Sequence, residues 1–216
     1  MTRSKSKGLG NLLWGLLALW FAAVLLLAYN RVYDSHGPIY VGISAAAPIL
    51  VFAIWFYSSA AFRQYVLSLN PTILTAVHTW RIEGIVFVLL CLMGFLPASF
   101  AYPAGFGDMA IGITAPFIAY AWSKKKLSSG AFVLWQSLGI ADLVVAVITG
   151  VLNSLPNIGI LAHGTTTRIM GLLPMSLIPT FAVPLMLILH IICIAQVRKL
   201  KRERAALSGS PALNLG

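Results

Sequence analysis

Charged side chains are scarce in this sequence, and acidic side chains are the scarcest. Only 9% of the 216 residues are charged, and these comprise 15 Lys or Arg but only 5 Asp or Glu. Soluble globular domains carry about 25% charged residues. Because 59% of this chain is hydrophobic, it cannot cover itself with a polar surface. The composition therefore excludes a soluble domain and predicts an integral membrane protein.

Motifs of soluble-type enzymes are also lacking. The sequence contains no nucleophile elbow, no HExxH zinc-protease motif, no P-loop and no CxxC pair, and it predicts no metal site. The only cysteines, Cys91 and Cys193, are expected to differ in depth by roughly 20 Å, which excludes a disulfide between them. The chain is therefore not expected to be an enzyme, although an intramembrane activity that uses Glu83, Asp142 or a histidine stays open.

Long apolar runs are what the sequence has instead. Six of them approach or exceed the ~18 residues typical of a membrane-spanning helix. They cover about 11–29, 39–58, 72–96, 104–122, 131–152 and 169–197. We predict an all-α membrane protein with a six-helix bundle over residues 1–204 and a disordered tail over 205–216. The first run is longer than a signal-peptide core, so it is predicted to be a retained anchor.

The basic residues predict the topology. With the N-terminus inside, twelve Lys or Arg fall in cytoplasmic segments, and only Arg31 and Arg168 fall in outer loops. This positive-inside bias predicts that both termini are cytoplasmic in a multi-pass inner (plasma) membrane protein. The KLKRER segment is expected to contact anionic lipids of the inner leaflet. Nucleic acid is not an expected partner, and the sequence leaves the oligomeric state open.

The segment HTWRIEG, residues 78–84, places Arg81 and Glu83 in or beside the third apolar run. Residues two apart on a helix do not face each other, so these two charges need separate partners. Asp142 is the expected partner of Arg81, and Asp108 is a less favourable one. Glu83 has no evident partner and is the predicted proton carrier. Alternatively, the whole segment lies at the inner headgroups.

Two aspartates complete the acidic set. Asp142 lies about eleven residues into its span, near the midplane, on a stripe of small or polar residues that includes Gln136 and Gly139. It is predicted either to fix helix packing through Arg81 or to form a proton or substrate site. Asp108 follows PAGFG near the outer side, where it is expected to cap its helix or to serve an outer mouth.

His78 and His190 are expected at one depth on oppositely running helices. Such a pair fits axial ligation of haem b, proton transfer, or ordinary polar packing in the core. No cofactor is predicted as the leading case, and haem is the alternative. The last span contains Pro174, Pro179 and Pro184, so its helix should bend or partly unwind.

The block LPASFAYPAGFGDMAIG (96–112), with RIEG (81–84), resembles hypothetical multi-pass bacterial inner-membrane proteins. The resemblance implies a six-span bundle and brings no activity. The leading functional hypothesis is a small-solute or proton-coupled carrier that uses Arg81, Glu83 and Asp142 near the midplane. The alternatives are a haem- or quinone-linked redox protein using His78 and His190, and a non-catalytic assembly or sensory protein.

Overall fold

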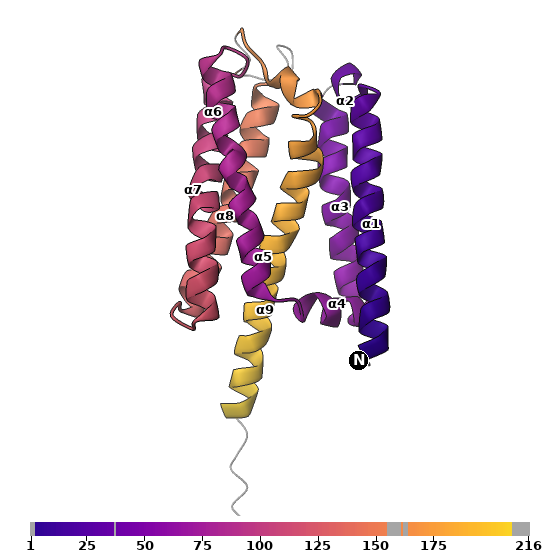
Figure 1. Ribbon diagram of the computed structural model, residues 1–216, viewed down its shortest axis with the longest axis vertical. Helices are drawn as coiled ribbons and strands as arrows, with labels where there is room; N and C mark the ends of the chain where they lie inside the picture. Colours follow the sequence, from indigo (N-terminus) through magenta and orange to yellow (C-terminus); the bar gives the residue numbers. More distant parts are fainter. Residues whose placement is uncertain (1–2, 37, 155–160, 162–163, 209–216) are drawn as a thin grey trace, which may run out of the picture.

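The computed structural model describes residues 3–36, 38–154, 161 and 164–208, and the described part of the chain is helical (Figure 1). The α-helices are α1 (Arg3–Tyr29), α2 (Val32–Ser35), α3 (Pro38–Ser58), α4 (Ala60–Leu67), α5 (Pro71–Val77), α6 (Ile85–Leu92), α7 (Ala98–Ser123), α8 (Ser129–Leu152) and α9 (Val183–Ser208). Tighter or wider turns form η1 (His78–Gly84), η2 (Thr167–Gly171) and η3 (Ile178–Ala182).

Six helical stretches are long and apolar enough to cross a membrane, as the sequence predicted. They are Gly8–Tyr29, Pro38–Ser58, Pro71–Leu92, Ala98–Ser123, Ser129–Leu152 and Ile178–Ala206. The third stretch combines α5, η1 and α6, and the sixth combines η3 with α9. Helix α3 has no buried residue along its whole length, which suits a helix whose neighbours include lipid.

The helices form an upright bundle with α9 near its centre (Figure 1). Helix α9 contacts α3 on one side and α5 and α8 on the other, while α7 packs against η1, α6 and α8. Helix α4 lies across the lower end, where Gln196 of α9 donates to the carbonyl oxygens of Val66 and Leu69 at 3.4 and 2.8 Å. Helix α4 thus connects the second and third candidate spans.

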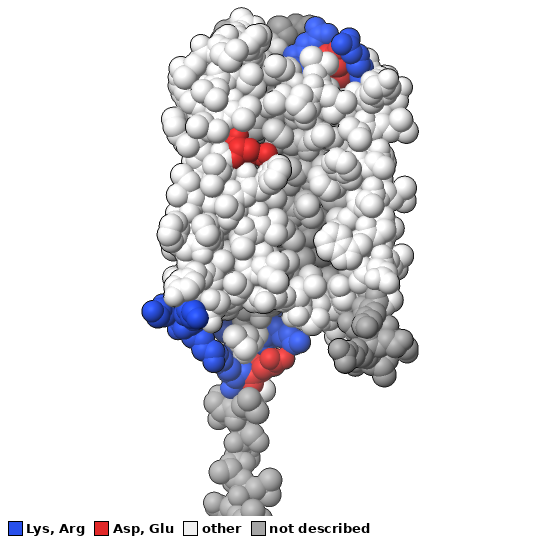
Figure 2. Space-filling view, viewed as in Figure 1, with Lys and Arg blue, Asp and Glu red and all other residues white. Residues whose placement is uncertain are grey.

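Exposed basic side chains lie at the ends of the bundle. Figure 2 shows Lys and Arg at both ends of one face, and a surface without Lys or Arg between them that is interrupted by one small acidic group. The first residues of α1 and the last residues of α9 lie at the same end (Figure 1). The opposite end carries an ion pair between Arg168 Nε and Asp34 Oδ1 at 2.8 Å.

Several helix ends differ from the predicted span boundaries, and the third candidate span ends at Leu92 instead of 96. The fourth span begins at Ala98 and not at 104, because the backbone of Pro97 is extended and the small residues after it form a helix through Pro103. The last long helix begins at Ile178 and not at 169. Residues 205–208 are helical, because α9 continues to Ser208, and the remainder of the predicted tail lies outside the described residues.

The expected disturbance of the last span by its prolines is confirmed. Residues Ile178–Ala182 form a π-helical turn that contains Pro179, and Pro184 follows at the start of α9. A second irregularity was not predicted, because α5 and α6 are joined by the 3-10 turn η1 instead of one continuous α-helix. Turn η1 lies in the middle of the third candidate span, and η3 forms the start of the sixth. Departures from α geometry within helices often accompany function.

Candidate functional site

The HTWRIEG segment is the 3-10 turn η1, and it is pressed against α7. Glycines at the contact make this close approach feasible. A Cβ on Gly84 would lie 2.7 Å from the carbonyl oxygen of Gly105, and one on Gly112 would lie 2.8 Å from the carbonyl carbon of Arg81. Small residues allow helix backbones to meet in this way. The contact buries Arg81, whose exposed fraction is 3%.

The Arg81 guanidinium is shared by two carboxylates. Its Nε donates to Asp108 Oδ1 at 2.6 Å, and its Nη2 donates to Asp142 Oδ2. Its Nη1 donates to the carbonyl oxygen of Gly139 at 3.3 Å and lies 3.2 Å from His190 Nε2. The predicted contact between Arg81 and Asp142 is confirmed, and the less favoured partner, Asp108, binds at the same time.

The position predicted for Asp108 was wrong. Because α7 begins at Ala98, Asp108 lies ten residues into the helix, about 15 Å along its axis. It neither caps the helix nor lies at an outer end, and its side chain is only 12% exposed. Arg81 is buried in the interior of the bundle, and its alternative placement at the inner headgroups stays a prediction.

The cluster of Arg81, Asp108 and Asp142 carries a surplus of negative charge when all three groups are ionised. One guanidinium balances one carboxylate, and the second carboxylate is left over. An uncompensated charge in a low-dielectric interior is costly, so a neutral cluster needs one bound proton or one cation. This stoichiometry follows from the side chains alone and does not depend on the length of any single contact.

Glu83 lies near this cluster but outside it. Its side chain is half-buried and lines a small crevice together with Trp80, Arg81 and Asp108. The side chain of Trp80, on the same turn, is its hydrogen-bonding partner. No ion pair of Glu83 occurs among the described residues, so the predicted separation of Glu83 from Arg81 is present. Its role as a proton carrier stays a prediction.

His78 and His190 meet, but not as ligands of a common ion. Their rings stack with centroids 3.8 Å apart and planes inclined by 15°. His190 Nδ1 donates to Gln136 Oε1, which leaves Nε2 to accept from Arg81. Both ring nitrogens of His78 are buried, and neither has a hydrogen-bond partner among the described residues. Axial ligation needs a porphyrin between the two rings. Since the rings are in contact, the pair does not fit haem.

A polar chain extends from the cluster through His190. Gln136 Nε2 donates to Thr75 Oγ1 at 3.1 Å, and Thr75 lies 3.9 Å from Cys193 Sγ. The stripe predicted around Asp142 includes Gln136 and Gly139, and a Cβ at Gly139 would overlap the ring of His190. Thr75 was missed, because a single threonine in an apolar run gives no signal of what it meets across the bundle.

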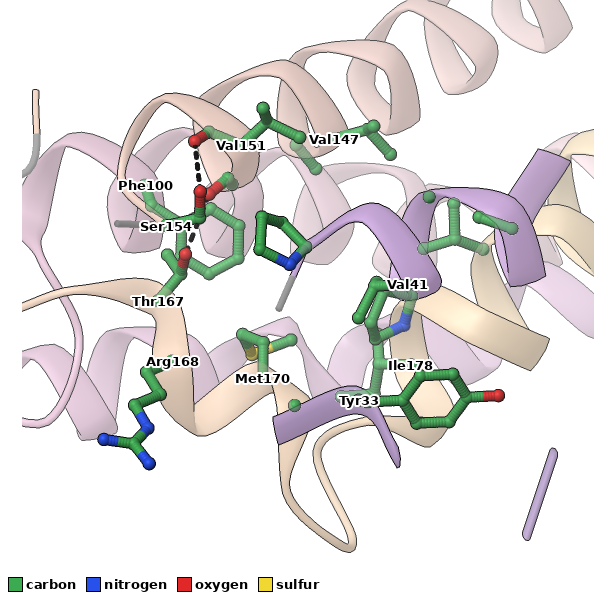
Figure 3. Close-up of a pocket in the computed structure, with 18 of the residues that line it drawn as sticks. Tyr33, Val41, Phe100, Val147, Val151, Ser154, Thr167, Arg168, Met170 and Ile178 are labelled. Carbon is green, nitrogen blue, oxygen red and sulfur yellow. Dashed lines mark hydrogen bonds between the residues drawn. The ribbon is translucent and has the colours of Figure 1, made fainter. Parts of the chain in front are cut away.

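An apolar cavity of about 260 Å³ lies beside the cluster, between α3, α7, α8 and the irregular segment before α9 (Figure 3). Asp108 lines it at depth, and the ion pair of Asp34 and Arg168 lines it at the end of the bundle. The hydrogen bond from Arg168 holds the pKa of Asp34 below its usual value, so this pair stays ionised at neutral pH. The sequence did not predict this cavity.

One family model matches residues 38–198, which is most of the chain. The chain belongs to the DUF8737 family, whose description is "domain of unknown function". The DUF8737 match covers every residue of the Arg81 cluster and both histidines, and it confirms the predicted membership in an uncharacterised family. No curated protein and no solved structure matches the chain.

Proposed function

We propose that this protein is a proton-coupled carrier of small solutes that crosses the plasma membrane six times with both termini in the cytoplasm. The observation that carries the proposal is the shared guanidinium of Arg81, which leaves one buried carboxylate of Asp108 or Asp142 to be neutralised. A group at this depth that must take up a proton or a cation is what coupled transport requires. The adjoining cavity gives a solute a place next to it.

The helix irregularities support a moving part at this site. Asp108, Ile178 and Val183 line both the large cavity and the crevice that contains Glu83. Ile178 and Val183 bound the π turn η3, so the wall between the two spaces is the least regular part of the sixth candidate span. Broken helices next to cavities are typical of secondary transporters. Rearrangement of this turn would change whether Asp108 is accessible from the cavity or from the crevice.

Charge distribution supports the proposed orientation. The end with α4 and the last turns of α9 carries most Lys and Arg, and the opposite end carries Arg31 and Arg168. Cytoplasmic segments of membrane proteins are enriched in these residues. The exposed basic residues at the end of α9 would then contact anionic lipids.

Proton binding is testable without knowing the solute. Proteoliposomes on a solid-supported membrane receive a jump from mildly alkaline to mildly acidic buffer, and the transient current is recorded. We expect a current from the wild type, because a proton that reaches the cluster moves charge into the membrane. Asp108→Asn and Asp142→Asn each leave one neutral pair with Arg81, so each should reduce the current by about tenfold or more.

Asp34→Asn is the matched control, because it removes a carboxylate outside the candidate spans, and it should keep the current. Glu83→Gln tests the second acidic group. Loss of current only in Glu83→Gln would show that the cluster is not the proton site. A wild type without any current would refute proton coupling and favour a packing role for the buried charges, as in an assembly or sensory protein.

A further inference from the structure

We infer that the cavity binds an amphipathic organic cation, with an aryl or alkyl body against the cavity walls and the charged group beside Asp108. This inference rests on the proposed carrier function and names its substrate class. It excludes the small anions that a buried arginine would first suggest.

The walls of the cavity favour an apolar body. They include the rings of Phe87 and Phe100 and the side chains of Val41, Val147 and Met170. Figure 3 shows that these walls come from separate segments of the chain that converge on one space. A single water needs about 10–15 Å³ of such volume. With about 260 Å³, the cavity therefore has room for a small organic molecule. Aromatic walls also attract cations through their ring faces.

The charges at the inner end favour a cation. Asp108 lines the cavity, whereas Arg81 does not. The guanidinium already hydrogen-bonds to Asp108, Asp142, Gly139 and His190, so it has few N–H groups left to bind an anion. The other charged or titratable groups near Asp108 are Asp142 on α8, Glu83 on η1 and His190 on α9. Both carboxylates strengthen the negative field.

The mouth of the cavity does not oppose a cation. Arg168 is the basic residue lining it, and its charge is balanced by Asp34 at 2.8 Å. A cation that enters therefore meets a neutral pair first and a surplus carboxylate last. Binding neutralises the same charge that a proton would neutralise. One proton leaves the Asp108–Asp142 carboxylates as one cation binds, so the two ligands exclude each other.

The test uses two probes of fixed charge. Benzyltrimethylammonium is a permanent cation, and phenylmethanesulfonate is an anion of similar size with the same benzyl group. Binding of each to the protein in lipid nanodiscs is measured by calorimetry over a range of pH. We expect only the cation to bind, with an affinity that rises by up to about tenfold per pH unit while the proton competes.

Two variants locate the site. Asp108→Asn should weaken cation binding by about tenfold or more and remove its pH dependence, since no surplus carboxylate remains. Gly150→Leu should weaken it by placing a side chain in the cavity, where a Cβ lies 3.4 Å from the Phe100 ring. Gly15→Leu is the matched control, because nothing lies within 4 Å of its Cβ position.

Equal binding of both probes, no binding of either, or unchanged binding in Asp108→Asn would overturn the inference. Loss of binding in Asp34→Asn alone would place the cation at the mouth and would also contradict it. The proton-coupled carrier is tested separately by the pH-jump current. A wild type that gives this current but binds no benzyltrimethylammonium would retain the carrier and reject the substrate class.

Discussion

Arg81 balances the charge of one buried carboxylate, but it does not neutralise the whole cluster. Removing one partner of a buried ion pair typically costs about 3–5 kcal/mol, because the remaining charge is left without compensation. Here the guanidinium faces two carboxylates, so replacing either aspartate by asparagine improves the charge balance instead of breaking it. The two aspartates are therefore the residues whose substitution separates function from folding, whereas substitution of Arg81 would confound the two.

The two stacked histidines differ in what they contribute. In the part of the chain that the structure describes, His78 has no hydrogen-bond partner for either ring nitrogen, whereas His190 joins Gln136 to Arg81. We expect His78→Phe to change the free energy of unfolding by less than about 1.5 kcal/mol, because ring volume and stacking are kept. His190→Phe should destabilise by about 2–5 kcal/mol, because it leaves a buried amide and a guanidinium N–H unpaired.

Thermal or denaturant unfolding of both variants in the same detergent measures the difference. A loss in His78→Phe as large as that in His190→Phe would show that the His78 imidazole does bind something in the folded protein.

At the scale of single residues, the sequence predicted which charged side chains lie within the helices better than it predicted how they pair. The scarcity of acidic residues singled out Asp108, Asp142 and Glu83, and helix geometry separated Glu83 from Arg81. It did not predict that one guanidinium binds both aspartates. That arrangement depends on the start of α7, because a start at 104 would leave Asp108 in the first turn.

At the scale of elements, the crossing of η1 and α7 positions the site. Gly112→Ala would place a Cβ 2.8 Å from the Arg81 carbonyl carbon, closer than real Cβ contacts come. The two backbones would have to separate, so we expect a loss of about 1–3 kcal/mol in stability. Gly15→Ala lies in α1 with nothing within 4 Å and should be neutral or stabilising by up to about 1 kcal/mol.

Unfolding measurements on the pair, together with the pH-jump current, check this expectation. Equal stability of the two variants would show that the backbones of η1 and α7 can separate at little cost. In that case α7 would not hold η1 tightly in place.

Local pattern explains why some elements were predictable and others were not. Asn70 caps α5 and Pro71 occupies its first turn, so adjacent residues alone predict the start of that helix. The prolines before α9 likewise disturb the helix at their own positions, and the π turn η3 results from this disturbance. The 3-10 turn η1 has no such local cause, because it arises where its Gly84 meets Gly105 of α7 and its Arg81 meets Gly112 of α7. The periodicity of hydrophobic residues in the sequence does not predict tertiary contacts of this kind.

At the scale of the whole molecule, the distribution of charge relates orientation to the direction of the proposed transport. The cavity reaches the end of the bundle that carries Asp34 and Arg168, away from the first residues of α1 and the last turns of α9. If that end is outside, the structure has its cavity open to external solute and its crevice closer to the cytoplasm. The orientation of the protein in the membrane therefore bears on the proposed transport mechanism as well as on the topology.

Single cysteines at exposed serines test this orientation without changing any charge. Ser35 lies beside the Asp34 end, and Ser68 follows α4 at the opposite end. In a background carrying Cys91→Ser and Cys193→Ser, we expect an impermeant maleimide to label Ser35→Cys on intact cells and to label Ser68→Cys only after permeabilisation. The physical reason is the positive-inside bias, which retains the basic end in the cytoplasm. Reversed labelling would show that the mouth of the cavity faces the cytoplasm. The bound cation would then be loaded from inside and exchanged for protons from outside, which is export and not uptake.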